Sequence, residues 1–463
     1  MARLGGLDAS LLFLEFGRQT MNICTLIELD TSTVPGGYSF EKFHSYLADR
    51  LAALPELRVK LADSRWNLDN PVWVDDLDFE LDRHLHRVVL APPCGRRELS
   101  DLAAAQTAGR LDRGRPLWEM WVIECGADCV GPDPRVAVLL KQHHAIMDGA
   151  SDTDLMGRLC STEVDAPAPA HLAGAGSATT GEIARDGAKL FARRPFHIST
   201  RLLPALARSI ATSAKLAFAA RAMSSPFRAP ATSFNGNATE VRNLAFVQLD
   251  LSEVKTAKNA FGVKVNDVVL ALLAGALRDH LLDRGELPAS DLLAMVPIAV
   301  EDRSATGGAN QLSAAFCTLH TGIADPVARL RAIAAASASA KHHSAALGPA
   351  LLRDTLQYVS PKLLGLAMRL YIWSGASARR PVCNISVSNV PAPPVQWYFG
   401  AAKVKAMYGL PPVMHGIGLH AGVSSLNGKL EIGLMSCPEL LPDLWSVADR
   451  IPDALKEILN AAT

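Results

Sequence analysis

The sequence predicts an α+β fold with two layered halves. The chain has 463 residues, of which 49% are hydrophobic and 20% charged, enough apolar sequence for two domains with large buried cores. Strand-like segments come in pairs around a helix-like segment instead of alternating regularly with helices, which favours α+β layers. A segment of different composition, 163–239, separates the predicted halves 1–162 and 240–463.

Hydrophobic periodicity predicts the elements of the first half. Residues 39–53 carry apolar side chains at helical spacing and begin with Ser39, a residue type that caps helices. The other predicted elements are a short turn or helix at 7–14, strands at 22–29, 118–124 and 136–140, an extended stretch at 70–93 and a helix at 99–111. Two interpretations of Pro116, Leu117 and Trp118 stay open: core packing at a strand start, which the pattern favours, and direct substrate contact.

The segment LLKQHHAIMDGAS, at 139–151, is the main functional signal of this half. An apolar run leads into His143 and His144, and Asp148 and Gly149 then turn the chain toward a helix start. Glycine adopts backbone conformations that a side chain resists. At the end of a buried strand, a neutral imidazole can be held in one tautomer and act as a general base near pH 7.

Three interpretations of this histidine pair compete. It can be a hydrogen-bonded core feature, a metal site or a catalytic base. The chain contains no HExxH motif, and its eight cysteines form no CxxC pair, which disfavours metal. Spacing alone does not decide between the other two.

The connecting segment has an unusual charge pattern. Its first part is rich in Ala, Pro, Gly and Ser, which indicates a flexible connection. Residues 187–239 contain no Asp or Glu but eight basic residues: Lys189, Arg193, Arg194, Arg201, Arg208, Lys215, Arg221 and Arg228.

Three of these basic residues have helical spacing. Arg201, Arg208 and Lys215 recur every seven residues with apolar residues between them, which predicts an amphipathic helical linker with a basic stripe. Residues 187–228 then either pack between the halves with their charges solvated, or contact an anionic membrane or lipid-droplet surface.

The second half repeats the mixed pattern. Asn266 and Asp267 precede an apolar helix at 268–282, and the helix dipole is sufficient to explain an acidic residue there. The other predicted elements are strands at 244–251, 292–300, 312–321, 382–387 and 430–434, and helices at 252–261, 326–341 and 439–460.

Charge and hydropathy limit the partners and the location. The 46 Lys and Arg balance 46 Asp and Glu, so no global basic field indicates nucleic acid. Asp8 interrupts the start of the chain before the apolar core of a signal peptide can form. No run of 18 apolar residues without a charge is present, so the sequence predicts no transmembrane helix. We therefore expect a cytoplasmic protein with reduced cysteines, which can lie peripherally on the inner face of the membrane or on lipid inclusions.

The motif His143-His144-Ala-Ile-Met-Asp148-Gly149 resembles the HHxxxDG signature of the superfamily that includes chloramphenicol acetyltransferase and peptide-synthetase condensation domains. The flanking sequence resembles the bacterial wax ester synthase/diacylglycerol acyltransferase family along nearly the entire chain. The similar motifs are LDAS at 7–10, PELR at 55–58, PVWVDDLDFELDRH at 71–84, LDRGRPLWEMWVIE at 111–124, NDVVLA at 266–271, SNVPAP at 388–393 and SSLNGKLEIGL at 424–434. Ala392, where the family often has glycine, and Cys437 depart from the pattern.

The resemblance implies a fold and a reaction. The fold is α+β, with two chloramphenicol acetyltransferase-like domains whose mixed sheets are flanked by helices, and a tunnel between them for acyl-CoA and a lipid alcohol. The reaction is transfer of a long-chain acyl group from CoA to diacylglycerol, giving triacylglycerol, or to a fatty alcohol, giving a wax ester. A thioester is already activated, so no metal or bound cofactor is expected.

The resemblance also implies roles for individual residues. His144 is the expected base, His143 shapes the site, and Asp148 fixes the loop. Candidate oxyanion donors are Asn266, Gln311, Ser388 and Asn389. Expected substrate-binding residues are Pro116, Leu117, Trp118, Gly149, Asn266, Asp267, Ser388 and Asn389.

Two other function classes remain open. HHAIMDGAS also resembles the HHxxxDGxS of condensation domains, which form amides from carrier-protein thioesters, but the chain contains no adenylation or carrier domain. The basic stretch is also compatible with a non-enzymatic protein that coats lipid inclusions or binds acyl-CoA. A binding protein would have no need of a base, which favours the enzyme.

Overall fold

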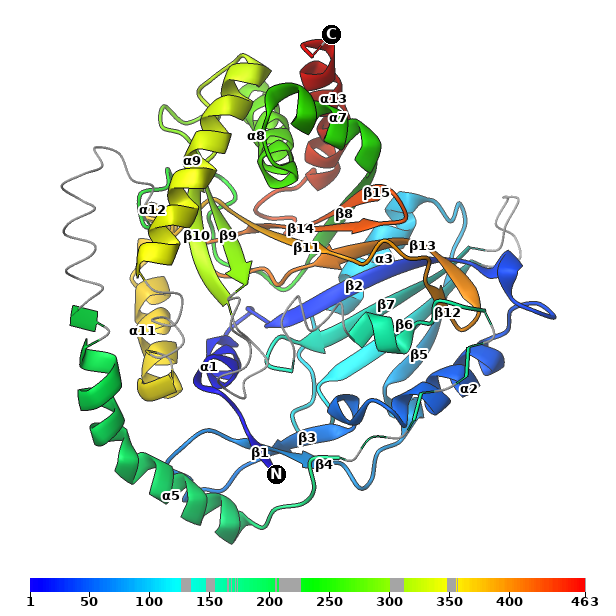
Figure 1. Ribbon diagram of the computed structural model, residues 1–463, viewed down its shortest axis with the longest axis vertical. Helices are drawn as coiled ribbons and strands as arrows, with labels where there is room; N and C mark the ends of the chain where they lie inside the picture. Colours follow the sequence, from blue (N-terminus) through cyan, green and yellow to red (C-terminus); the bar gives the residue numbers. More distant parts are fainter. Residues whose placement is uncertain are drawn as a thin grey trace.

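The structure is a computed structural model that describes the chain except for residues 126–134, 147–154, 165, 168, 171, 173, 205, 208–225, 300–311, 348–354, 356 and 463. The described part contains two six-stranded sheets flanked by helices, and a small three-stranded sheet (Figure 1). This arrangement confirms the predicted α+β layers.

The first six-stranded sheet has the strand order β12-β13-β2-β7-β6-β5. Its strands are β2 (Asn22–Asp30), β5 (Leu85–Leu90), β6 (Trp118–Cys125), β7 (Arg135–His143), β12 (Tyr398–Phe399) and β13 (Ala402–Leu410). The helices of this half are α1 (Gly6–Leu14), α2 (Phe40–Leu51) and α3 (Arg96–Thr107), and its small sheet contains β1 (Ala2–Arg3), β3 (Val59–Ala62) and β4 (Val72–Asp75). The side chain of Ser39 caps α2 by accepting a hydrogen bond from the Lys42 amide, as the sequence predicts.

The second sheet has the order β10-β9-β11-β14-β15-β8. Its strands are β8 (Asn243–Asp250), β9 (Leu293–Ala299), β10 (Leu312–Thr318), β11 (Ile385–Pro391), β14 (Leu419–Leu426) and β15 (Lys429–Ser436). The helices are α7 (Leu251–Phe261), α8 (Val265–Asp283), α9 (Pro326–Leu347), α11 (Pro361–Trp373), α12 (Ala376–Arg379) and α13 (Leu444–Asn460). Because residues 268–277 of α8 are apolar on all sides, this part of the helix lies buried in the centre of the core, packed against α13 and the sheet.

The strands β12 and β13 cross from one half to the other. They follow β11 in the chain, yet β13 pairs antiparallel with β2 at the edge of the first sheet, while β14 returns to the second sheet. Segment 398–410 of the second half therefore completes the sheet of the first. Nothing in the sequence pattern predicts this exchange, and the predicted boundaries at 162 and 240 remain predictions.

The edge of β13 that faces away from β2 packs against the second sheet at two glycines. Gly422 and Gly433 face each other across β14 and β15, and a Cβ on either one would overlap the carbonyl oxygen of Gly409 in β13. Near this close approach, a polar side chain of β14 binds the backbone of β13: Ser424 Oγ donates to the Met407 carbonyl at 2.8 Å. The absence of side chains at the pair allows this close approach.

Glu431 completes the contact between the sheets. Its side chain is fully buried, accepts a hydrogen bond from the Met407 amide at 2.7 Å and accepts a second one from Gln248 at 3.1 Å. Burial raises the pKa of this carboxyl group to about 8, and the two hydrogen bonds and the nearby Glu28 change the pKa less.

The linker begins with α5 (Thr180–His197), which continues into a π-helical turn, η4 (Ile198–Leu202). Gly187 packs closely on Asn67, and Arg194 forms a largely buried ion pair with Asp69 at 2.9 Å. At least one residue of the basic stretch therefore binds the first half instead of facing outward. Arg208 and Lys215 of the predicted stripe lie outside the described residues.

Two further expectations concern the whole chain. Among the described helices, none is by itself long and apolar enough to cross a membrane, although the sharply bent pair α7–α8 meets that criterion by length and composition. The expectation that all cysteines are reduced is wrong, because Cys94 is disulfide-bonded, while the other six described cysteines form no disulfide. Scattered sequence spacing does not show which cysteines the fold brings together.

Gly422→Ala should destabilise the protein by about 1–3 kcal/mol, because a methyl group forced into a close-packed contact displaces the backbone. Gly409→Ala is the matched control, since a Cβ at Gly409 has no atom within 4 Å. Urea unfolding midpoints measure both. An equal midpoint for the two variants would contradict the close contact.

Glu431→Gln should change how stability depends on pH. The folded carboxyl group holds its proton up to about pH 8 and the unfolded one only to about 4.5, so its contribution to stability declines as pH rises through this window and is constant above it. The amide cannot ionise, so the variant should lack this decline. Urea midpoints between about pH 5 and 9 test it, and an unchanged slope would contradict the raised pKa.

Candidate active site

The histidine pair is held between the starts of two neighbouring strands. The His143 amide donates to the Leu117 carbonyl at 2.9 Å, and the His144 amide donates to the Met21 carbonyl at 2.7 Å. His143 ends β7 opposite Asn22 of β2. The backbone of both histidines is therefore fixed by the first sheet.

The ring of His143 has two defined hydrogen bonds. Its Nδ1 accepts the Ala145 amide proton at 3.0 Å, and its Nε2 lies 3.0 Å from the Glu15 carboxylate. Because Nδ1 is the acceptor, the proton of the neutral ring is on Nε2 and is donated to Glu15. Both side chains are buried. His143 is thus locked in one tautomer with both ring nitrogens occupied.

Two arginines surround Glu15. Arg110 Nε lies 3.4 Å and Arg113 Nη2 lies 3.8 Å from its carboxylate. Burial by itself raises the pKa of Glu15, but the hydrogen bond from His143 and the positive charges around it outweigh burial, so the pKa lies below its usual value. Glu15 therefore remains ionised and orients His143 permanently.

Glu15 was not predicted from the sequence. The residue stands 128 positions before His143, at the end of α1. The only signal was a carboxylate directly after the apolar run Leu11–Leu14, and no spacing rule connects it to the histidine pair.

His144 follows directly and is half-buried. It is the first residue of the turn 144–146, which the Ile146 amide closes by donating to the His143 carbonyl at 3.0 Å. Of the other loop residues predicted for the site, Asp148 and Gly149 lie outside the described residues, as does Gln311.

The loop lies where the two halves meet. The His415 amide donates to Gln19 Oε1 at 2.7 Å, and the Phe16 and His415 rings lie 5.3 Å apart. Arg242 donates to the Arg18 carbonyl at 2.8 Å. The segment between α1 and β2, which also supplies the Met21 carbonyl, is therefore held by the second half.

A cavity of about 590 Å³ opens beside this segment. Arg110, which lines the cavity, also forms the ion pair with the Glu15 carboxylate. Thr20, another lining residue, precedes Met21, whose carbonyl accepts the His144 amide proton. The lining residues are Gly17, Arg18, Thr20, Ala108, Gly109, Arg110 and Glu240. Its walls thus include residues from both sides of the predicted linker.

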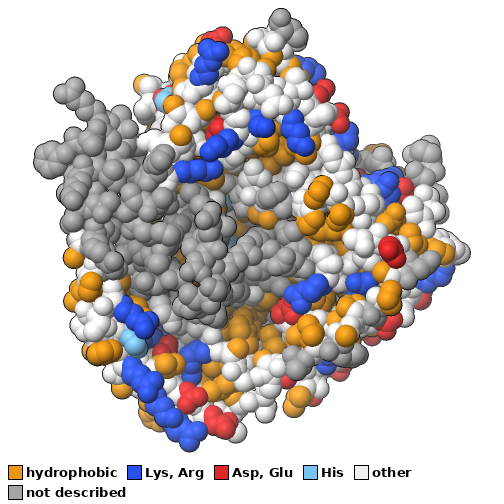
Figure 2. Space-filling view, in the orientation of Figure 1, with side chains coloured by type: hydrophobic (Ala, Val, Ile, Leu, Met, Phe, Trp, Pro, Cys, Tyr) orange, Lys and Arg blue, Asp and Glu red, His pale blue; other side chains and the backbone are white. Residues whose placement is uncertain are grey.

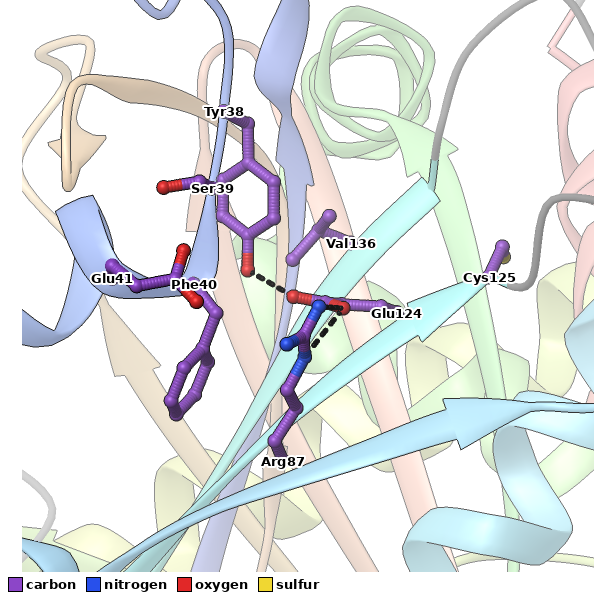
Figure 3. A pocket seen from close by; sticks show the side chains of 8 residues that line it. All are labelled: Tyr38, Ser39, Phe40, Glu41, Arg87, Glu124, Cys125 and Val136. Atoms are coloured by element: carbon purple, nitrogen blue, oxygen red, sulfur yellow. Dashed lines mark hydrogen bonds and ion pairs between the residues drawn. The ribbon is translucent and has the colours of Figure 1, made fainter.

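A second, smaller pocket of about 250 Å³ lies at the opposite end of the first sheet (Figure 3). Tyr38 donates to Glu124 at 2.7 Å, and Arg87 forms an ion pair with the same carboxylate at 2.8 Å. Val136, near the start of β7, lines this pocket, whereas His143 ends that strand. The pocket is therefore remote from the histidine loop.

Two predicted motifs of the second half meet each other. Asn389, near the end of β11, donates to Asn266 at the start of α8 at a long 3.4 Å, and Ser388 precedes it on the strand. Asp267 accepts the Lys264 amide proton at 2.9 Å, so it caps α8. The Asn266 and Asn389 side chains are thus in contact, and Ser388 is the residue before Asn389 on β11. Asp267 has the structural role that the sequence offered for it.

Pro116, Leu117 and Trp118 are buried. The indole of Trp118 donates to the Leu57 carbonyl at 2.7 Å and stacks on His84 with ring centres 4.8 Å apart. The Leu117 carbonyl binds the His143 amide. These contacts agree with the interpretation that Pro116, Leu117 and Trp118 pack in the core and support the backbone of His143.

Within the described part of the chain, no group of three or more His, Cys, Asp or Glu side chains is arranged to hold a metal ion.

Glu15→Ala should cost about 1–3 kcal/mol of stability, because it leaves buried polar groups without their acceptor, and Glu15→Gln should cost less because an oxygen remains. Because the pKa of Glu15 is lowered, its contribution exists above about pH 4.5 and is lost as pH falls through the folded value. Urea midpoints at pH 7 and in acid test both statements. Equal losses for the two variants at pH 7 would contradict the proposed hydrogen bond.

Comparison with known proteins gives a consistent result. The family model described as wax ester synthase/diacylglycerol acyltransferase catalytic domain matches residues 4–269, and the WS/DGAT C-terminal domain matches residues 308–459. A putative diacylglycerol O-acyltransferase of Mycobacterium tuberculosis is 46% identical over 100% of this chain and 91% of its own length. A second putative diacylglycerol O-acyltransferase of that organism is 34% identical over 92% of each chain.

Solved structures agree. The wax ester synthase/diacylglycerol acyltransferase from Marinobacter aquaeolei VT8 superposes with a TM-score of 0.72 at 26% identity and covers 100% of both chains. The first condensation domain of the calcium-dependent antibiotic synthetase covers 99% of this chain and 97% of its own, with a TM-score of 0.58 at 14% identity, and shares the fold alone. The chain belongs to the wax ester synthase/diacylglycerol acyltransferase family.

Proposed function

We propose that the protein transfers a long-chain acyl group from acyl-CoA to diacylglycerol, giving triacylglycerol, and that a fatty alcohol is a second acceptor, giving a wax ester. The observation that carries this proposal is the locked His143, whose ring is fully occupied by Glu15 and the Ala145 amide. It leaves the adjacent His144, at the interface of the two halves, as the histidine for chemistry.

In the proposed reaction, His144 takes the proton of the acceptor hydroxyl while the oxygen attacks the thioester carbonyl carbon. The tetrahedral oxyanion then collapses, the carbon–sulfur bond breaks, and CoA leaves as a thiol with the proton that His144 accepted. The thioester supplies the activation, so the proposal includes no metal, no bound cofactor and no acyl-enzyme.

Hydrogen-bond donors must stabilise the oxyanion. Among the described candidates, Asn266 and Asn389 share one hydrogen bond, which leaves a second amide proton on Asn389 and both on Asn266 available. Together with Ser388 they are the proposed donors. Asp148 and Gly149 remain proposed as the residues that fix the loop.

The proposed acyl acceptor implies where in the cell the protein works. Diacylglycerol resides in a bilayer or a lipid inclusion, so we propose that the protein works peripherally on such a surface, on the cytoplasmic side. The acid-free residues 187–239 support this, because basic side chains bind anionic surfaces.

His144→Ala should reduce turnover by about 10²–10⁴, the usual contribution of a general base. His44→Ala, a half-exposed histidine paired with Asp82, is the control and should retain activity. The assay is release of CoA from palmitoyl-CoA with and without diolein. Full activity of a folded His144→Ala protein would contradict the mechanism.

The same assay separates the alternatives. A condensation-type enzyme would use an aminoacyl carrier protein instead of diolein, and a lipid-binding protein would release no CoA with any acceptor.

A further inference from the structure

The helix α11 carries an exposed apolar stripe. Four large side chains recur at intervals of three, four and three residues, so they share one face of the helix: Leu363 (61% exposed), Leu366 (48%), Leu370 (56%) and Trp373 (73%). A row of large apolar side chains in water indicates an interaction surface.

The opposite face of α11 is firmly attached to the first half. Pro361, Gly365 and Ile372 are buried, and a Cβ on Gly365 would lie 2.9 Å from the Phe13 carbonyl oxygen in α1. The Arg369 guanidinium lies over the Phe16 ring, 5.3 Å from its centre. The stripe is therefore held in a fixed orientation and has no partner within the described part of the chain.

The end of α5 extends the same surface. The rings of His197 and Tyr358 stack 5.7 Å apart, which connects the end of α5 to the segment before α11. Both helices run along one side of the molecule (Figure 1). Phe196 and Leu203 are the exposed large apolar side chains near this end of α5 in the described part of the linker.

Charge favours a negative partner. Residues 187–239 contain no Asp or Glu, and neither do residues 355–430, which include all of α11. The exposed basic residues in or just after α11 are Lys362, Arg379 and Arg380. Figure 2 shows basic side chains gathered along the lower left edge, where α5 runs. Two acid-free stretches that are distant in sequence thus meet on one side of the molecule.

We propose that the α11 stripe, together with the end of α5, docks on a phospholipid bilayer that contains anionic lipids. Leucines enter the acyl region, Trp373 and Phe196 lie at the interface where aromatic rings are favoured, and the basic side chains contact phosphates. The inference deepens the proposed function and rests on it for the reason to dock, namely an acceptor that resides in lipid.

The position of α11 also connects docking to the catalytic residues. Gly365 and Arg369 contact the two ends of the segment that contains Glu15, and Glu15 holds His143. The lipid surface would therefore lie against the helix that packs on α1, one layer from the histidine loop.

The test is sedimentation of the full-length protein with vesicles of phosphatidylcholine and phosphatidylglycerol, without substrates. Wild type should bind these vesicles and bind pure phosphatidylcholine far less. Leu370→Glu combined with Trp373→Glu should lower vesicle binding at least about tenfold, since charges are disfavoured in the acyl region. Thermal midpoints should stay close to wild type because both side chains are exposed.

The matched control is Leu77→Glu. Leu77 is 86% exposed, but it lies outside α5 and α11 and between Asp76 and Asp78, so this variant should bind vesicles as wild type does. Equal binding by the double variant and wild type would overturn the proposal, as would absence of binding by wild type. A change from dimer to monomer in the double variant, measured by sedimentation velocity, would identify the stripe as a contact between two copies and also overturn it.

These outcomes are independent of catalysis. Vesicle binding requires no acyl transfer, and CoA release from palmitoyl-CoA with a water-soluble alcohol requires no vesicles. Failure of docking and failure of the proposed reaction therefore give different results.

Discussion

The position of β13 across the Gly422–Gly433 pair is the contact on which both halves depend. The strand completes the first sheet beside β2, and its other edge meets β14 and β15 so closely that no side chain fits there. The hydrogen bonds of Ser424 and Glu431 with Met407 satisfy that edge, which would otherwise be a buried row of unpaired peptide groups. The two sheets cannot separate without exposing it.

This arrangement explains how the backbone of His143 and His144 is fixed although it lies between the two halves. The second half holds the segment after α1 through His415 and Arg242, and that segment binds the His144 amide. Glu15, at the end of the same helix, fixes the ring of His143. In the proposed mechanism, His143 therefore positions the site and His144 transfers the proton, so one sequence motif would contain two different physical roles.

Sequence alone predicted the elements whose pattern is local. The helices α2 and α8 follow from their periodicity and caps, and the histidine loop follows from its motif. It did not predict β13 or Glu15, because their partners lie at the other end of the chain and no spacing connects them. Trp118 and Leu117 were ambiguous, because apolar residues next to a catalytic motif have the same pattern whether they line a site or support it. The stripe on α11 was missed since exposed leucines at helical spacing resemble a core face.

The central claim is that His144 is the general base and that His143 only positions it. The most direct measurement is the pH dependence of kcat/KM for a water-soluble alcohol in wild type and in the residual activity of His144→Ala. Wild type should show an acid limb in which kcat/KM rises about tenfold per pH unit until the base is deprotonated. The variant should lack this limb. The same limb at the same pH in both proteins would contradict the claim.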